Sequence, residues 1–261
     1  AFALAGGSQS GPFAAFFDFI PVGFDHIVPK GLDHILFVLG LFFLSTRLRP
    51  LIWQVSAFTL AHTVTLALAS LGYVNIPAEF MWIVESIIAL SIVYVAVENI
   101  FTDGLSPWRP AVIFGFGLLH GLGFAAVLAE FGLPEANFIP ALIGFNIGVE
   151  VGQLAVIAVA FLCVTKAIDY AKTGAESRPL AIAYLVAMVV AMALIVPLNA
   201  AYPEIVGDLI PLLVIVGILL GLSAASLVVG RFDSYREIVG MPGSVLIGLA
   251  ATYWVIERMF L

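Results

Sequence analysis

The sequence is poor in charge and in cysteine. Charged residues make up 10% of its 261 positions, whereas an ordinary soluble domain has about a quarter. The single cysteine, Cys163, excludes a disulfide bond within the chain. A net charge of −7 argues against nucleic acid as a partner. Hydrophobic residues make up 62% of the chain, in long runs rather than short alternating segments. The composition therefore predicts an all-α, polytopic transmembrane helical bundle.

The apolar runs divide the chain into about eight expected spans, with seven as the alternative count. The expected helices cover residues 31–45, 50–72, 78–100, 110–131, 140–166, 179–200, 204–230 and 241–260. Prolines mark most of their starts, where the missing N–H has no helical partner to lose. Residues 13–27 are interrupted by Pro21 and Gly23, so we expect an interfacial or re-entrant segment there. The expected organisation is an extracytoplasmic or interfacial segment, 1–30, followed by a transmembrane bundle, 31–261.

Loop charges predict the orientation of this bundle. With eight spans, one side receives Arg47, Arg49, Arg109, Lys166, Lys172, Arg178, Arg231 and Arg236. The positive-inside rule makes that side cytoplasmic. Both termini are then expected outside the cytoplasm.

Polar side chains at membrane depth occur mainly in the first five expected helices. Charged groups and imidazoles are costly in hydrocarbon and usually have a function there. Imidazole and carboxylate ligands together suit divalent ions such as nickel, cobalt or zinc. We therefore expect a metal site drawn from His26, Asp33, His34, His62, Glu85, His120, Asn146 and Glu150. The three helices after residue 178 have few such groups and are expected to serve as scaffold.

The positions of these residues along their helices predict two levels. At about 1.5 Å per residue, His62 and His120 fall near the membrane centre and Asp33 and His34 near the outer surface. We therefore expect His26, Asp33 and His34 to form an outer entrance above a deeper site. The alternative is that single polar residues, such as His62 or Asn146, only join helices by hydrogen bonds.

Several stretches resemble a known family. They read GFDHIVPKGLDHILFVLGLFFLS at 23–45, FTLAHTVTLALASLG at 58–72, FGFGLLHGLGFA at 114–125 and GFNIGVEVGQLAV at 144–156. In these stretches the chain resembles the HupE/UreJ family of bacterial membrane proteins. The resemblance implies a nickel or cobalt permease of the bacterial inner membrane that serves hydrogenases or ureases.

The resemblance also implies site residues. His26, Asp33 and His34 match the histidine–aspartate–histidine motif of the family's first helix, and His120 matches its histidine–glycine motif. Six residues separate His26 from Asp33 here, one more than in the better-studied permeases. The acidic residue expected soon after the histidine–glycine pair is absent. We expect Glu85 and Glu150 to replace it.

The expected function is a permease or binding protein for a divalent transition metal. No ATP-binding motif is present, which favours a secondary transporter over an enzyme or a pump. Two alternatives stay open: an intramembrane, hydrolase-like metalloenzyme whose metal activates water, and an accessory subunit with a structural metal. The expected partners are the metal ion and the lipid bilayer, with a homo-oligomer or a larger membrane complex left open.

Overall fold

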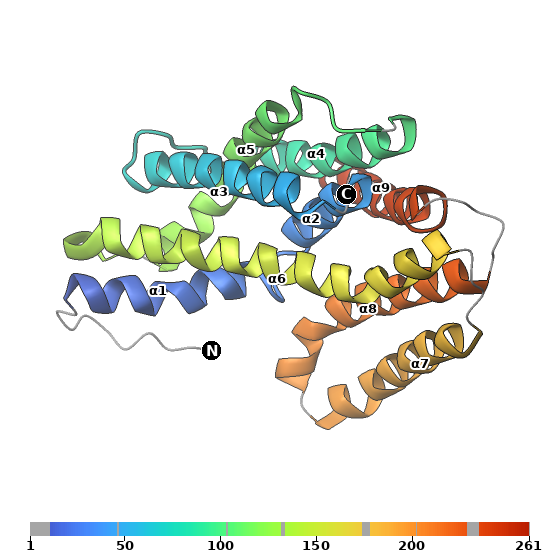
Figure 1. Cartoon of the computed structure of the whole chain (residues 1–261). Helices are drawn as coiled ribbons and strands as arrows, with labels where there is room; N and C mark the ends of the chain where they lie inside the picture. The colour runs from blue at the N-terminus through green and yellow to red at the C-terminus, as the bar shows by residue number, and fades with distance from the viewer. Residues whose placement is uncertain are drawn as a thin grey trace.

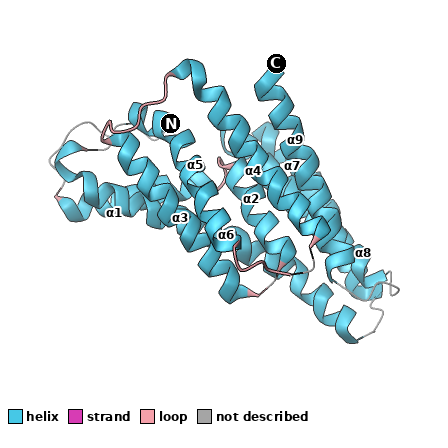
Figure 2. Ribbon diagram, turned by 90° about the horizontal axis from the view of Figure 1, so that it is seen from above, coloured by secondary structure: helices cyan, strands magenta, loops and turns pink. Residues whose placement is uncertain are grey.

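A computed structural model describes residues 11–45, 47–102, 104–131, 134–173, 178–201, 203–228 and 235–260. Within these ranges the regular secondary structure is entirely helical, and the prediction of an all-α fold is confirmed (Figures 1 and 2). The first ten residues of the expected extracytoplasmic segment lie outside the described ranges.

The helices follow the expected ranges closely. Their bounds are α1 Pro12–Ile27, α2 Leu32–Leu44, α3 Leu48–Ser70, η1 Ala78–Phe80, α4 Met81–Phe101, α5 Arg109–Phe131, η2 Glu135–Asn137, α6 Phe138–Thr173, α7 Arg178–Ala201, α8 Pro203–Val228, η3 Arg236–Gly240 and α9 Met241–Phe260. The largest difference is α6, which continues past the expected end at residue 166. The sequence explains this, because no proline or glycine follows Gly152 until Gly174.

The segment around Pro21 and Gly23 is a continuous helix of 16 residues, α1. It packs along the first half of α6, as Figure 1 shows. Glycines permit this close approach, because a Cβ on Gly144 or Gly148 of α6 would overlap backbone carbonyl oxygens of α1. Gly23 likewise lies against the backbone of Phe145. The glycine that interrupts the apolar pattern is therefore a packing position.

Helices α1 and α2 meet at an angle of 74° across a short break. Together they are apolar and long enough for one broken span or a re-entrant loop. By length and composition, three described stretches suit a membrane crossing on their own: Leu48–Ser70, Ala78–Phe101 and Phe138–Val164. The broken pair would make a fourth, and shorter apolar helices lie at Arg109–Phe124, Arg178–Leu194 and Ile210–Ala225. The count of eight spans stays a prediction.

Helix α2 lies at the centre of the bundle. Every residue from His34 to Phe43 is buried, and α2 packs against α4, α6 and α9. The most extensive helix pairs around it are α1 with α6, α3 with α5, and α4 with α9 (Figures 1 and 2). The α7–α8 pair lies at one edge of the molecule. A helix that is apolar on all sides is stable when neighbours enclose it, as they do here.

Candidate metal centre

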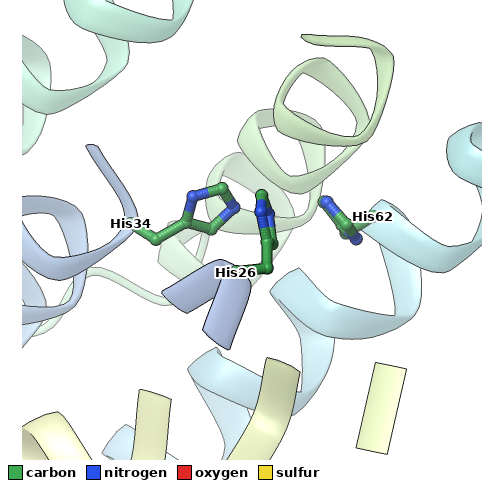
Figure 3. A group of neighbouring side chains, drawn as sticks. All are labelled: His26, His34 and His62. Carbon is green, nitrogen blue, oxygen red and sulfur yellow. The ribbon is translucent and has the colours of Figure 1, made fainter. Parts of the chain in front are cut away.

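Four imidazoles from four helices meet beside the break between α1 and α2. His26 lies in the last turn of α1, His34 in the first turn of α2, and His62 and His120 near the middles of α3 and α5. The ring centroids of His26 and His120 each lie 4.8 Å from that of His34. The His62 ring lies 5.7 Å from His34 and 6.0 Å from His26. Figure 3 shows the rings of His26, His34 and His62 converging, with His26 between the other two.

The four histidines and Asp33 form two groups that share His34. One consists of His26, His34 and His62, and the other of Asp33, His34 and His120. Within each group the candidate ligand atoms lie within 4.8 Å of one another. We call the five residues together the histidine centre. His34, His62 and His120 are buried, whereas the side chain of Asp33 is 28% exposed.

The bend between α1 and α2 brings His26 close to Asp33 and His34. A Cβ on Gly31 would overlap the carbonyl oxygen of His26, so the absence of a side chain lets the backbone turn tightly there. The backbone N–H of Ile35 then bonds to the carbonyl of Gly31 and begins α2. The local sequence thus places one ligand candidate at the end of a helix and two at the start of the next.

Hydrogen bonds indicate which nitrogen of His62 and of His34 is free. The amide nitrogen of Asn146 donates to the Leu142 carbonyl at 2.9 Å, which leaves its Oδ1 to accept from Nδ1 of His62 at 3.3 Å. Asp33 Oδ1 accepts from Nδ1 of His34 at 3.2 Å. Both neutral imidazoles then carry their lone pair on Nε2.

The free nitrogens are buried. Nε2 of His26, His34 and His62 is inaccessible and has no hydrogen-bond partner in the part of the chain that the structure describes. Buried polar atoms without partners are rare and costly. A cation held between these three nitrogens, with the proton of His26 on Nδ1, would satisfy all of them.

His120 presents a similar arrangement toward Asp33. Ser91 Oγ donates to the Ile88 carbonyl at 2.7 Å and therefore accepts from Nε2 of His120 at 3.2 Å. The lone pair of His120 then lies on Nδ1, which is 3.8 Å from Asp33 Oδ2. Two acceptors facing each other repel unless a positive charge lies near both. Sequence reasoning left Ser91 out of the site, although a polar residue near the middle of an apolar helix was a usable signal.

The expected separation between an outer entrance and a deeper site is wrong. Asp33 and His34 lie directly beside His120, and His34 lies beside His62. Two separate levels would require a helix over residues 31–45 that begins at the membrane surface. Because α1 precedes α2 and packs into the bundle, the first turn of α2 lies in the interior.

Three expected ligands lie outside the two groups. Asn146 acts on the centre through its hydrogen bond to His62. Glu85 lies 3.8 Å from Arg258, and its side chain is 47% exposed. Glu150 accepts a hydrogen bond of 2.6 Å from Ser56. The structure thus gives Glu85 and Glu150 partners away from the imidazoles.

A second polar cluster lies at the end of the bundle where α5 begins. Arg109, which is buried, donates to Glu98 at 2.6 Å and to Gln54 at 2.9 Å. Asn99 is also buried and donates to the Gly40 carbonyl at 2.7 Å. The cluster ties α2, α3, α4 and α5 together at this end.

Comparison with known proteins identifies the family. No curated protein and no solved structure matches the chain. A family model described as HupE / UreJ protein matches residues 5–198. The match includes α1 to α6 and the whole histidine centre. This chain, with its apolar helices and grouped histidines, belongs to the HupE / UreJ family of membrane proteins.

Proposed function

We propose that the protein is a permease for a divalent transition metal, with nickel or cobalt as the preferred cargo and zinc as a less favoured one. The observation that carries this proposal is the set of buried, unpartnered imidazole nitrogens in the histidine centre. His26, Asp33, His34, His62 and His120 would hold the ion, and Asn146 would orient His62.

The ligand chemistry supports these metals. Imidazole nitrogen with one carboxylate suits nickel, cobalt and zinc, whereas calcium and magnesium prefer oxygen ligands alone. In His34, His62 and His120, the nitrogen that does not face the ion is hydrogen-bonded to a polar neighbour, as in established metal sites. Such a neighbour holds the ring orientation and raises the affinity of the free nitrogen.

The position of the centre supports transport. His62 and His120 lie near the middles of α3 and α5, and the ends of α1 and α2 lie beside them. Discontinuous helices whose ends meet near the membrane centre are typical of substrate sites in secondary transporters. The ion would enter past Asp33, and its transport would be passive or coupled to another ion.

The enzyme alternative has less support. A metal-dependent hydrolase needs a general base beside the metal-bound water. Asp33 is itself a ligand candidate, and Glu85 and Glu150 have partners elsewhere. We further propose a bacterial plasma-membrane location, with the Arg47 end of the bundle in the cytoplasm and both termini outside.

Nickel uptake by cells that express the protein tests the proposal. Asp33→Asn and His120→Ala are each expected to abolish uptake, because each removes a ligand from a buried site. Asp18→Asn is the matched control, since Asp18 is exposed on α1. Uptake at the wild-type rate in both site variants would overturn the proposal. Metal analysis of the purified protein gives an independent result, and nickel or cobalt retained in proportion to the protein is expected.

A further inference from the structure

Polar side chains continue from the histidine centre along the contact between α3 and α6. His62 pairs with Asn146 at 3.3 Å, and Thr59 donates to Oε1 of Gln153 at 3.0 Å. Ser56, a further turn along α3, donates to Glu150 at 2.6 Å. Their partners on α6, at positions 146, 150 and 153, are four and three residues apart and share one face of that helix. The polar groups therefore form one line along the contact, although Thr59 pairs with the farther Gln153 and Ser56 with the nearer Glu150. The line leads from the centre toward the Arg47 end of the bundle.

Glu150 needs an explanation. It lies within Phe138–Val164, a stretch apolar enough to cross a membrane, and it is half-buried. Its partner is a hydroxyl group, and no basic side chain pairs with it in the part of the chain that the structure describes. A carboxylate at membrane depth is costly and usually lies on an ion or proton path.

Gln153 is a second, independent sign of a ligand. Its side chain is completely buried, and its Nε2 has no hydrogen-bond partner among the described residues. An amide offers two donors on one side and an acceptor on the other. If the group rotates, the nitrogen donates to Thr59 Oγ and the carbonyl oxygen becomes available to a cation.

The contact between α2, α3 and α5 offers no such line. There the ring of Phe37 packs 5.0 Å from that of Phe58 and 6.0 Å from that of Phe116. Phe37 and Phe58 are buried and lie directly against the ring of His120. An ion that left the imidazoles in this direction would have to cross an apolar layer, where desolvation is costly.

We propose that Ser56, Thr59, Glu150 and Gln153 form a second cation position, lined by oxygen atoms, which the metal ion occupies after it leaves the imidazoles. This inference rests on the proposed function. Carboxylate, carbonyl and hydroxyl oxygens are harder ligands than imidazole and suit nickel or cobalt less well. A weaker second position favours release, because conduction requires binding that an ion can leave. Glu150 then controls the rate of transport, while the histidine centre sets the affinity.

The test compares nickel binding and nickel transport in the same variants. Binding of Ni²⁺ is measured by calorimetry on the purified protein, and uptake of Ni²⁺ is measured in proteoliposomes. Glu150→Gln is expected to slow uptake by about tenfold or more, because the ion loses its charged ligand on the way out. The affinity at the histidine centre should stay within about twofold, because the two positions do not share ligands. Glu150→Asp, which keeps the carboxylate, should recover much of the rate. Glu257→Gln, at an exposed carboxylate of α9, is the matched control.

Two results would overturn this inference and leave the proposed function intact. One is wild-type uptake by Glu150→Gln, and the other is a loss of Ni²⁺ binding equal to the loss of uptake. If Glu150→Gln does not fold, Gln153→Leu replaces it: slow uptake with unchanged binding supports the second position, and wild-type uptake overturns it. A wild-type protein that neither binds nor transports Ni²⁺ would overturn the proposed function as well.

Discussion

The nitrogen that His62 or His120 can offer to a metal ion depends on the neighbour of its other nitrogen. Asn146 holds Nδ1 of His62, and Ser91 holds Nε2 of His120. Each neighbour is fixed in turn, because the Asn146 amide donates to Leu142 and the Ser91 hydroxyl to Ile88. These chains of hydrogen bonds keep the free lone pairs directed toward the centre. A metal site therefore depends on residues that never touch the ion.

Replacement of Asn146 tests this dependence. Asn146→Ala is expected to weaken Ni²⁺ binding by about 10- to 100-fold, as is usual when the partner of a metal-binding histidine is lost. Asn146→Asp keeps an acceptor for Nδ1 of His62 and should bind Ni²⁺ more tightly than the alanine variant. Calorimetry on the purified proteins measures both affinities. Equal affinity of Asn146→Ala and the wild type would show that His62 needs no such partner, or that it does not bind the ion.

At the scale of helices, the break between α1 and α2 creates the histidine centre. A single straight helix would carry His26 and His34 eight positions apart, more than two turns along its axis. The 74° bend instead brings their rings to a centroid distance of 4.8 Å. Helix α1 keeps its position through its glycine-lined contact with α6.

Much of this arrangement was predictable from the sequence. Prolines and apolar runs located α2 to α9 within a few residues, apart from the end of α6. All five residues of the histidine centre were among the expected ligands, four as polar groups in apolar helices and His26 through its match to the family motif. The direct contact of Asp33 and His34 with His120 was not predictable. Pro21 and Gly23 interrupt the apolar pattern of α1, so its sequence did not predict a continuous helix packed on α6. The glycine pattern of α6 did not show which helix it would contact. Such partners depend on packing between segments far apart in the sequence.

The contact between α1 and α6 can be tested at Gly148. A side chain there would overlap the backbone carbonyl of Ile20, so Gly148→Leu should force α1 away from α6 and displace His26. We expect a loss of about 1–3 kcal/mol in stability from overpacking, together with weaker Ni²⁺ binding. Thermal unfolding in detergent and calorimetry measure the two effects. Gly115→Leu is the control, because a Cβ on Gly115 meets no atom within 4 Å. Equal behaviour of the two variants would contradict the role given to this contact.

At the scale of the whole molecule, the two sides of the histidine centre differ. On one side the partly exposed carboxylate of Asp33 lies against the centre. On the other side the aromatic layer of Phe37, Phe58 and Phe116 is followed by the buried cluster of Arg109 with Glu98, Gln54 and Asn99. The structure is therefore closed between α2, α3 and α5 at the end where α5 begins. Under the proposed permease function, this cluster would keep that side of the bundle closed.

The charge pair in that cluster gives the last prediction. Glu98→Gln leaves the buried Arg109 guanidinium without its counter-charge, and the loss of one partner from a buried pair typically costs about 3–5 kcal/mol. Removal of both charges in Glu98→Gln with Arg109→Gln takes away the uncompensated charge, so the double variant should be more stable than the Glu98→Gln variant. Unfolding in detergent of the wild type, Glu98→Gln, Arg109→Gln and the double variant gives the four stabilities that a double-mutant cycle needs. Strictly additive losses would mean that the 2.6 Å contact does not couple the two residues. A strong coupling would identify the pair as a major stabiliser of the contact between α3, α4 and α5 at this end.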